Sequence, residues 1–596
     1  MMAFKEYFSF EAIVGDLIRW RVKGKGTFDE NGRRDVEMVL PPRKAWSRAD
    51  AKARKGVDPE IVRKQAIWRT VRRECDEIGK CCQPPSPRLR RSGCGNVASF
   101  NVANSQLRWV ESLMRLVDEV QEVVFSGKVV LEKPRSIRVI KGYKDGVREF
   151  RYVASFDNIV DRVILSRTTA YVRDVLEGVL GDCCYSFRSD PEMSHQLAIA
   201  KLQEWRGEQA VARDARPYRA PQMYVAECDI KKFFDNISHD VVRRCWDKVG
   251  FVPLAGKVLE AYLAVYAANA DAQERVPPER WSRDDGHIVP RRGLPQGGSF
   301  STVLANLVLH EADEAVEALD DGRLFYARYC DDVVIAHADE SVCRAALEAY
   351  KAALARLDLP IHPVEPFVYR PADGTATDYY TVKSKGPFRW SKPEVGEANC
   401  APWVSFLGSQ VRYDGETRIR KESIERHIRA LGRETAKAVR EIEKGGVRGA
   451  PALPCASEWF SRFRNRLIAK GVGYVTAKVS DCRMCWAGAF ARVTDCADTR
   501  KQMRRLDRVR EGMLCKVWRM LGGALGDRAL PCGAEVGGAL GDRALPSGGQ
   551  NSRRSASLPR HYKGKPFSYC GFLEKAARPT NMRSRRRLIA LPYSEL

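Results

Sequence analysis

A chain of 596 residues is longer than one hydrophobic core usually holds, so its length excludes a single compact domain and predicts two to four structural units. Its composition, with 44% hydrophobic and 30% charged residues, excludes a disordered or collagen-like chain. Lysine and arginine number 101 against 76 acidic residues. This net charge of +25 favours a polyanionic partner such as nucleic acid, although a solvated basic surface would have the same composition.

Secretion and membrane insertion are not expected from the sequence. Charges interrupt the apolar pattern of residues 1–20, which leaves no core for a signal peptide, and no apolar stretch is long enough to span a bilayer. The 18 cysteines are spread along the chain, and several lie in apolar runs, as Cys228 does, so a disulfide framework is not expected. We therefore expect a cytoplasmic protein without a membrane partner.

The sequence divides into five predicted regions in chain order. Residues 1–95 form a basic N-terminal extension, whose lysines and arginines either contact nucleic acid or form solvated helix faces. Residues 96–415 mix apolar strands, Gly-rich turns and amphipathic helices, which indicates an α+β domain. Residues 416–520 repeat apolar residues at helical spacing among many arginines. Residues 521–550 hold a Gly-rich decamer twice, which indicates a linker, and residues 551–596 are a basic tail.

The first motif is an aspartate at the end of a predicted strand. Residues 224–230 alternate as a strand does, and Asp229 ends it before the chain turns into a predicted helix at residues 231–237. A single aspartate in this position is commonly a turn former or a helix cap, so it indicates little by itself.

The second motif in chain order is the loop Gly293-Leu-Pro-Gln-Gly-Gly298, which leads into an apolar helix. Such a loop brings bare backbone close to a ligand, and Gln296 has the groups to hydrogen-bond a base or a sugar. A purely structural turn is the alternative interpretation.

The third motif, Tyr329-Cys-Asp-Asp332, joins two β-prone runs and predicts a hairpin. Its adjacent carboxylates, Asp331 and Asp332, repel each other unless a cation neutralises them. Carboxylate oxygens suit Mg²⁺ or Mn²⁺ better than softer ions. An Asp-Asp turn without a metal is also common.

Together and in this order, the three motifs resemble those of the reverse transcriptase family, in its bacterial branch near the group II intron-encoded enzymes. The resemblance implies a right-hand polymerase fold of α+β class, with fingers and palm in residues 96–415 and a basic helical thumb with a C-terminal helical region in 416–520. The catalytic positions of the family match Asp229, Asp331 and Asp332, with Cys330 in place of the familiar alanine. The matching metal-binding positions are Asp229, Ile230, Asp331 and Asp332, and the matching nucleotide-binding positions are Arg151, Phe234, Gln296 and Gly297.

Less specific segments extend the resemblance. Residues 404–408 look like the primer-grip hairpin, and residues 157–162 and 185–189 look like elements of the bacterial fingers and palm. Phe234, five residues after Asp229, stands where a bulky ring would exclude a ribose 2′-hydroxyl. RNA-dependent RNA polymerases have a polar residue there, so Phe234 favours DNA synthesis.

The implied activity is an RNA-directed DNA polymerase that uses two Mg²⁺ ions, with Mn²⁺ as a substitute, to join dNTPs into a DNA product on an RNA template. Without a recognisable nuclease, the chain resembles the stand-alone bacterial enzymes, several groups of which serve in anti-phage defence with a companion structured noncoding RNA. A retroelement or intron-encoded maturase-type RNA-binding reverse transcriptase and an RNA-dependent RNA polymerase remain alternatives. The sequence leaves the oligomeric state open.

Overall fold

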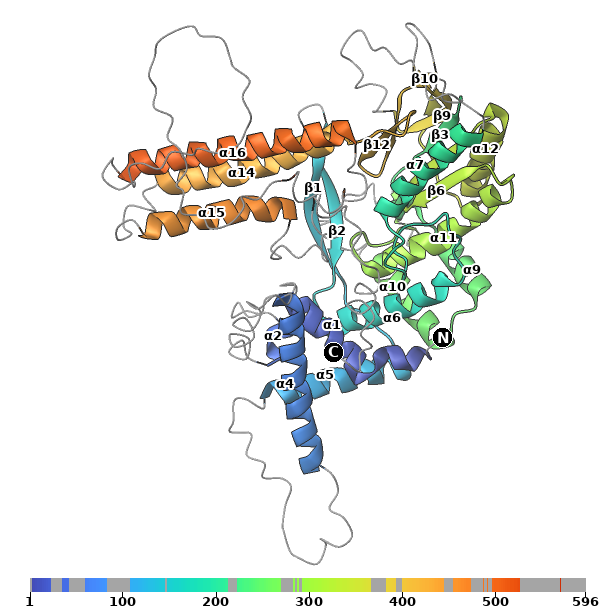
Figure 1. Cartoon of the computed structure of the whole chain (residues 1–596). Helices are drawn as coiled ribbons and strands as arrows, with labels where there is room; N and C mark the ends of the chain where they lie inside the picture. The colour runs from blue at the N-terminus through green and yellow to red at the C-terminus, as the bar shows by residue number, and fades with distance from the viewer. Residues whose placement is uncertain are drawn as a thin grey trace, which may run out of the picture. The chain divides into compact units, whose positions relative to one another are not determined.

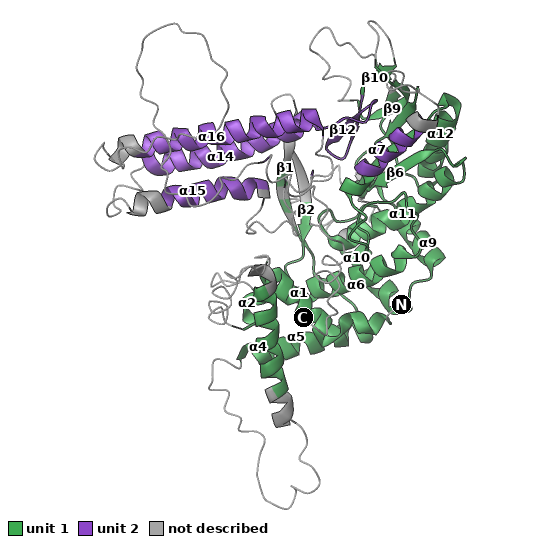
Figure 2. Cartoon of the chain, in the orientation of Figure 1, with its two compact units in different colours: residues 1–198, 213–402, 586–596 green, residues 199–212, 403–585 purple. Residues whose placement is uncertain are grey.

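The helices and strands fall into two compact units, which Figure 2 shows in green and purple. The computed structural model describes residues 3–22, 35–41, 59–82, 108–144, 147–212, 222–268, 282–284, 287–288, 292–365, 382–392, 399–443, 454–472, 486, 490, 496–525 and 569. The first unit is built from residues within 1–198 and 213–402, and the second from residues within 199–212 and 403–585. The elements are mainly helical with several small sheets, which confirms the α+β class.

Division into five regions stays a prediction. The predicted linker beyond residue 525 and the basic tail, apart from Tyr569, lie outside the described residues. In the described part of the chain, no helix has the length and apolarity that a membrane span requires.

The helices of the first unit bury apolar faces at helical spacing. In α5, for example, Val110, Leu113, Val117 and Val120 are buried and repeat every three or four residues, while the side chains between them are mostly polar. These helices are η1 (Phe4–Phe8), α1 (Phe10–Val22), α2 (Asp35–Met38), α4 (Pro59–Cys82), α5 (Arg108–Phe125), α6 (Ile159–Glu177), α8 (Phe233–Asn236), α9 (His239–Val249), α10 (Pro253–Ala268), α11 (Ser299–Glu317) and α12 (Glu340–Arg356). Helix α7 (His195–Ala212) begins in the first unit and ends in the second.

The first unit contains a six-stranded sheet beside α12 (Figure 1). Its order is β10-β9-β3-β7-β6, with β8 beside β9. Helix α12 packs against β3, β7 and β9, and α11 packs against α12. The strands are β3 (Tyr224–Cys228), β6 (Phe325–Tyr329), β7 (Asp332–His337), β8 (Val364–Glu365), β9 (Ser384–Trp390) and β10 (Cys400–Ala401).

Two antiparallel hairpins complete the first unit. The longer joins β1 (Arg135–Lys144) to β2 (Val147–Ser155), and the shorter joins β4 (Ser282–Asp284) to β5 (His287–Ile288). The backbone of β2 continues into the turn before α6, whose first turn is capped by the side chain of Asn158.

The second unit contains a small antiparallel sheet followed by helices. Strands β11 (Trp403–Phe406), β12 (Ser409–Arg412) and β13 (Thr417–Ile419) pair in chain order, so the predicted primer-grip hairpin at 404–408 is the β11–β12 hairpin. Helices α14 (Lys421–Glu443), α15 (Pro454–Val472) and α16 (Ala497–Leu525) then pack side by side (Figure 1). Their shared core includes Leu431, Phe463 and Val517.

Candidate active site

Three aspartates lie at the same end of the six-stranded sheet. Strand β3 pairs with β7 so that Cys228 lies opposite Val333, and the next position along each strand brings Asp229 opposite Asp332. Asp331 belongs to the two-residue turn between β6 and β7, which the pair Tyr329 and Asp332 closes. The sheet order therefore brings together residues that are about a hundred positions apart in the sequence.

The turn itself has an unusual backbone. Cys330, its first residue, has φ +60°, a conformation that two-residue hairpin turns normally assign to glycine or asparagine. The Cys330 N–H donates to Ser186 Oγ at 2.9 Å. The side chain is buried, and burial raises the pKa of the Cys330 thiol well above its ordinary value.

Asp229 is held by residues at the starts of β8 and β9, and β9 is the neighbour of β3 on the side away from β7. Its backbone N–H donates to Ser384 Oγ at 3.0 Å, and its carboxylate lies 2.9 Å from Lys383 Nζ and 3.7 Å from His362 Nε2. Sequence reasoning missed Lys383 and His362, because neither belongs to a local motif and both reach Asp229 only through strand pairing.

The site residues offer oxygen donors to a divalent metal. Among the described residues, no group of three or more His, Cys, Asp or Glu side chains is gathered closely enough to hold a metal ion. The donor chemistry nevertheless fits Mg²⁺ or Mn²⁺, because the strand register brings three carboxylate residues to one sheet end. Ile230 has an apolar side chain, so it has only its carbonyl oxygen to offer a metal.

The loop of residues 293–298 lies between α8 and β2. Leu294 N–H donates to the carbonyl oxygen of Phe234 at 2.7 Å, and the Gln296 side-chain amide donates to Asp235 Oδ1 at 3.0 Å. On the other side, Ala154 N–H donates to the carbonyl oxygen of Gln296 at 2.8 Å. Gln296 is therefore oriented by α8 and β2 together.

Gly297 fits this position because it has no side chain. Its φ is +95°, and a Cβ there would lie 2.3 Å from Val153 Cγ1 in β2. The close approach accounts for the glycine that follows Gln296. Arg151, two residues before Val153, lies opposite Val139 in the β1–β2 hairpin, and its side chain is outside the described residues.

The two phenylalanines of α8 have different surroundings. Phe233 is 3% exposed and belongs to the core, whereas Phe234 is only half-buried. Their ring centroids are 5.2 Å apart. Phe234 therefore has free ring surface beside the residues that bond the loop, and its role in sugar selection stays a prediction.

Residues 149–364 match the family model described as reverse transcriptase (RNA-dependent DNA polymerase). The chain therefore contains a reverse transcriptase domain. Every predicted site residue lies within the matched segment, and the predicted enzyme class, RNA-directed DNA polymerase, is confirmed. Divalent-metal catalysis, an RNA template and a DNA product are what this family implies. No curated protein matches the chain.

Several solved structures are similar to the chain at low identity. Apo telomerase from Candida tropicalis has a TM-score of 0.33 and 10% identity, over 68% of this chain and 66% of that one. Telomerase from Candida albicans in complex with a TWJ fragment of telomeric RNA has a TM-score of 0.32 and 10% identity, over 70% and 65%. A C-terminally truncated apo telomerase from Candida tropicalis has a TM-score of 0.29 and 11% identity, over 51% and 59%. The chain thus spans less than two thirds of the length of each telomerase.

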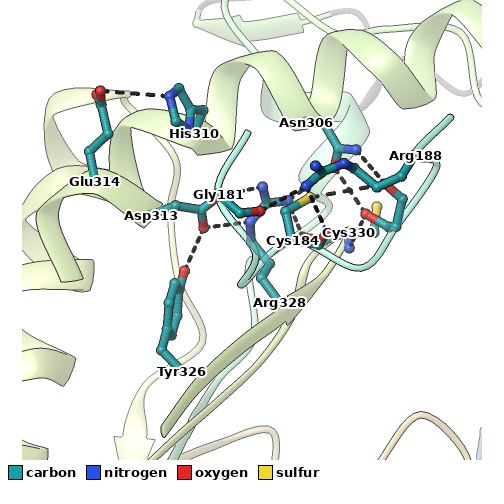
Figure 3. Close-up of polar contacts among 11 residues, drawn as sticks. Gly181, Cys184, Arg188, Asn306, His310, Asp313, Glu314, Tyr326, Arg328 and Cys330 are labelled. Atoms are coloured by element: carbon teal, nitrogen blue, oxygen red, sulfur yellow. Dashed lines mark hydrogen bonds and ion pairs between the residues drawn. The ribbon is translucent and has the colours of Figure 1, made fainter. Parts of the chain in front are cut away.

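A buried polar network lies against the β6–β7 turn of the reverse transcriptase domain (Figure 3). At its centre, Arg328 of β6 and Asp313 of α11 are both 0% exposed and form a two-pronged ion pair. Burial by itself would lower the pKa of Arg328, but the carboxylate of Asp313 raises that pKa well above its ordinary value. Sequence reasoning missed this pair. The only sign of it in the sequence is that a charged residue stands at an apolar position of the strand and another at an apolar position of the helix.

Proposed function

We propose that this chain synthesises DNA on an RNA template at the sheet end that carries Asp229, Asp331 and Asp332. The observation that carries the proposal is the β3–β7–β6 register, since it aligns the three carboxylate residues within the segment that matches the reverse transcriptase family. The incoming dNTP would lie beside the loop that holds Gln296 and Gly297.

The metal ions of the family would be held by Asp229, the carbonyl oxygen of Ile230, Asp331 and Asp332. Two Mg²⁺ ions, or Mn²⁺ in their place, supply charge neutralisation and activation of the primer 3′-hydroxyl when they are bound. Before a metal is bound, Lys383 stabilises the carboxylate of Asp229 at 2.9 Å. Such a neighbouring cation reduces the repulsion among the aspartates at one sheet end.

The nucleotide would be positioned by groups that the structure orients in advance. Gln296 is bonded to Asp235, and the loop is bonded to α8 and to β2, so little ordering remains for the moment of binding. Phe234 would meet the sugar, and Arg151 of β2 would contact the triphosphate.

The second unit supports a nucleic-acid interface. Exposed basic side chains repeat every three or four residues along one face of α14, at Arg426, Arg429, Arg433, Lys437 and Arg440. A row of cations at this spacing suits phosphates of an RNA or DNA backbone. Together with the resemblance, this supports our proposal of a helical thumb with a C-terminal region in residues 416–520, beside the fingers and palm proposed for residues 96–415.

Replacement of one aspartate tests the activity. Asp331→Asn should abolish primer extension on an RNA template in Mg²⁺, while thermal unfolding and RNA binding stay unchanged, because only a carboxylate charge is lost. Asp247→Asn, an exposed aspartate of α9 outside the site, is the matched control and should extend normally. Undiminished extension by Asp331→Asn would show that the site is assigned wrongly.

For the biological role, we propose a bacterial, cytoplasmic reverse transcriptase that acts with a companion structured noncoding RNA in anti-phage defence. This proposal rests on resemblance to the stand-alone bacterial enzymes. Sequencing the nucleic acids that co-purify with the protein tests it: one predominant noncoding RNA with its complementary DNA is expected. A predominant intron RNA would favour the maturase alternative.

A further inference from the structure

The ion pair of Arg328 and Asp313 lies entirely inside the protein core. Both side chains are 0% exposed, with Arg328 Nε 2.7 Å from Asp313 Oδ1 and Nη2 2.5 Å from Oδ2. Tyr326 Oη donates to the same carboxylate at 2.6 Å. Apolar residues of similar volume often stabilise a core as well as a buried ion pair does, so core stability does not account for this pair.

The guanidinium nitrogen of Arg328 that does not contact Asp313 faces the turn that bears Asp331 and Asp332. Its Nη1 donates to the carbonyl oxygen of Cys330 at 3.3 Å and to Asn306 Oδ1 at 3.1 Å. Ser186 Oγ also donates to Asn306 Oδ1, at 2.9 Å, and accepts the N–H of Cys330 at 2.9 Å. Asn306 Nδ2 donates back to the carbonyl oxygen of Ser186 at 2.6 Å. The network therefore contacts both the N–H and the carbonyl oxygen of Cys330 (Figure 3).

This turn needs such support for two reasons. Cys330 has φ +60°, and a residue with a side chain holds that conformation only where its surroundings fix it. The next two residues, Asp331 and Asp332, carry like charges that favour opening of the turn. Hydrogen bonds to the Cys330 backbone oppose both tendencies, and they come from side chains that are themselves fully buried.

Helix α11 connects this support to the nucleotide loop. It begins at Ser299, directly after Gly298 of the loop, and carries Asn306 and Asp313 seven residues apart on one face. One helix thus starts at the loop and holds the network beneath the turn.

Resting on the proposed function, we propose that Ser186, Asn306 and Arg328 are positioning residues of the polymerase, anchored by Asp313, that fix the Asp331-Asp332 turn for nucleotide addition. None of them contacts substrate in this role. They act through the Cys330 peptide, so their loss should lower kcat and leave the affinity for primer and template unchanged.

The positioning role can be tested with two variants that each remove one hydroxyl group from the same network. Ser186→Ala removes the acceptor of the Cys330 N–H, whereas Tyr326→Phe removes a donor to Asp313 that does not contact the turn. We expect kcat for dNTP addition on a primed RNA template to fall by about 10- to 100-fold in Ser186→Ala, because a displacement of about 1 Å at a reacting group has an effect of that size. In Tyr326→Phe we expect kcat within twofold of the native value.

Amide hydrogen exchange supplies a readout that is independent of activity. The Cys330 amide should exchange faster in Ser186→Ala and at the native rate in Tyr326→Phe. Each protein is measured the same number of degrees below its own melting temperature. If Ser186→Ala does not fold, Ser186→Cys, whose thiol is a weaker acceptor, takes its place with both readouts.

The outcomes separate the two proposals. A native protein that extends no primer refutes the proposed function, while the exchange comparison still decides whether Ser186 holds the turn. Equal loss of kcat in both variants, or an unchanged Cys330 exchange rate in Ser186→Ala, overturns the positioning role.

Discussion

Replacing Gly297 by alanine tests whether the nucleotide loop must lie as close to β2 as the structure shows. The new Cβ would be 2.3 Å from Val153 Cγ1, whereas carbon atoms in contact are about 3.5–4.0 Å apart. The loop and the strand would therefore separate by about 1.2 Å or more. Such a separation would stretch or break the hydrogen bond from Ala154 N–H to the carbonyl oxygen of Gln296.

Gly297→Ala should lower both the stability and the activity of the protein. A positive φ costs a residue with a side chain about 1–2 kcal/mol, and overpacking costs about 1–3 kcal/mol, so the free energy of unfolding should fall by about 2–5 kcal/mol. Displacement of a positioning group by about 1 Å lowers catalysis about 100-fold. We expect Gly297→Ala to lower kcat/KM for dNTP by about that factor, measured by primer extension on an RNA template.

Two further variants separate strain from overlap. Gly250 also has a positive φ, at +75°, but a Cβ there meets nothing within 4 Å. Gly250→Ala should therefore lower the free energy of unfolding only by the cost of a positive φ, about 1–2 kcal/mol, and should leave kcat/KM unchanged. Adding Val153→Ala to Gly297→Ala removes the overlapping methyl group and should recover part of kcat/KM. The reasoning fails if Gly297→Ala extends as the native protein does, or if Val153→Ala restores nothing.

Three other predictions address the sugar, the nucleic acid and a buried acid. Phe234→Ala should lower the ratio of kcat/KM for dNTP over rNTP by about 5- to 150-fold, as loss of a steric clash of about 1–3 kcal/mol implies. Phe233→Ala, in the core, should lower both efficiencies at a constant ratio. The affinity for RNA should fall steeply as the salt concentration rises. The double variant Arg429→Gln with Arg433→Gln should reduce the steepness of the slope of log K against log salt by about 1.4–1.8. Arg344→Gln, paired with Glu340, is the control that should leave this slope unchanged. Burial raises the pKa of Asp161 from 3.8 to about 6, so stability should decrease as pH rises through that range, and Asp161→Asn should abolish the decrease in a pH series of melting temperatures.

The local parts of the site could be predicted from the sequence because short-range patterns determine them. Alternation in residues 224–228 gives β3, and the β-prone runs around Asp331 and Asp332 give the β6–β7 hairpin, as expected. The Gly-rich loop before α11 was likewise visible, because glycine is needed where φ is positive and the backbone approaches a neighbour.

Long-range contacts could not be predicted in the same way. Lys383 reaches Asp229 because β9 pairs with β3, and Asp313 reaches Arg328 because α11 packs near β6. Neither partner choice follows from local propensity, since each depends on sheet order and on which polar residues a helix turns inward. A charged residue inside an apolar strand, as Arg328 is, signals a buried partner but does not name it.

Sugar selection and nucleotide positioning should be coupled, because one set of hydrogen bonds serves both. Leu294 N–H bonds to the carbonyl oxygen of Phe234, and the Gln296 side chain bonds to Asp235 in the same short helix. A loop displaced by Gly297→Ala would therefore carry Phe234 with it and weaken discrimination against rNTP. The double variant Gly297→Ala with Phe234→Ala should then change the dNTP to rNTP ratio by less than the product of the single changes. Strictly multiplicative effects would show that α8 and the loop act independently, even though hydrogen bonds join them.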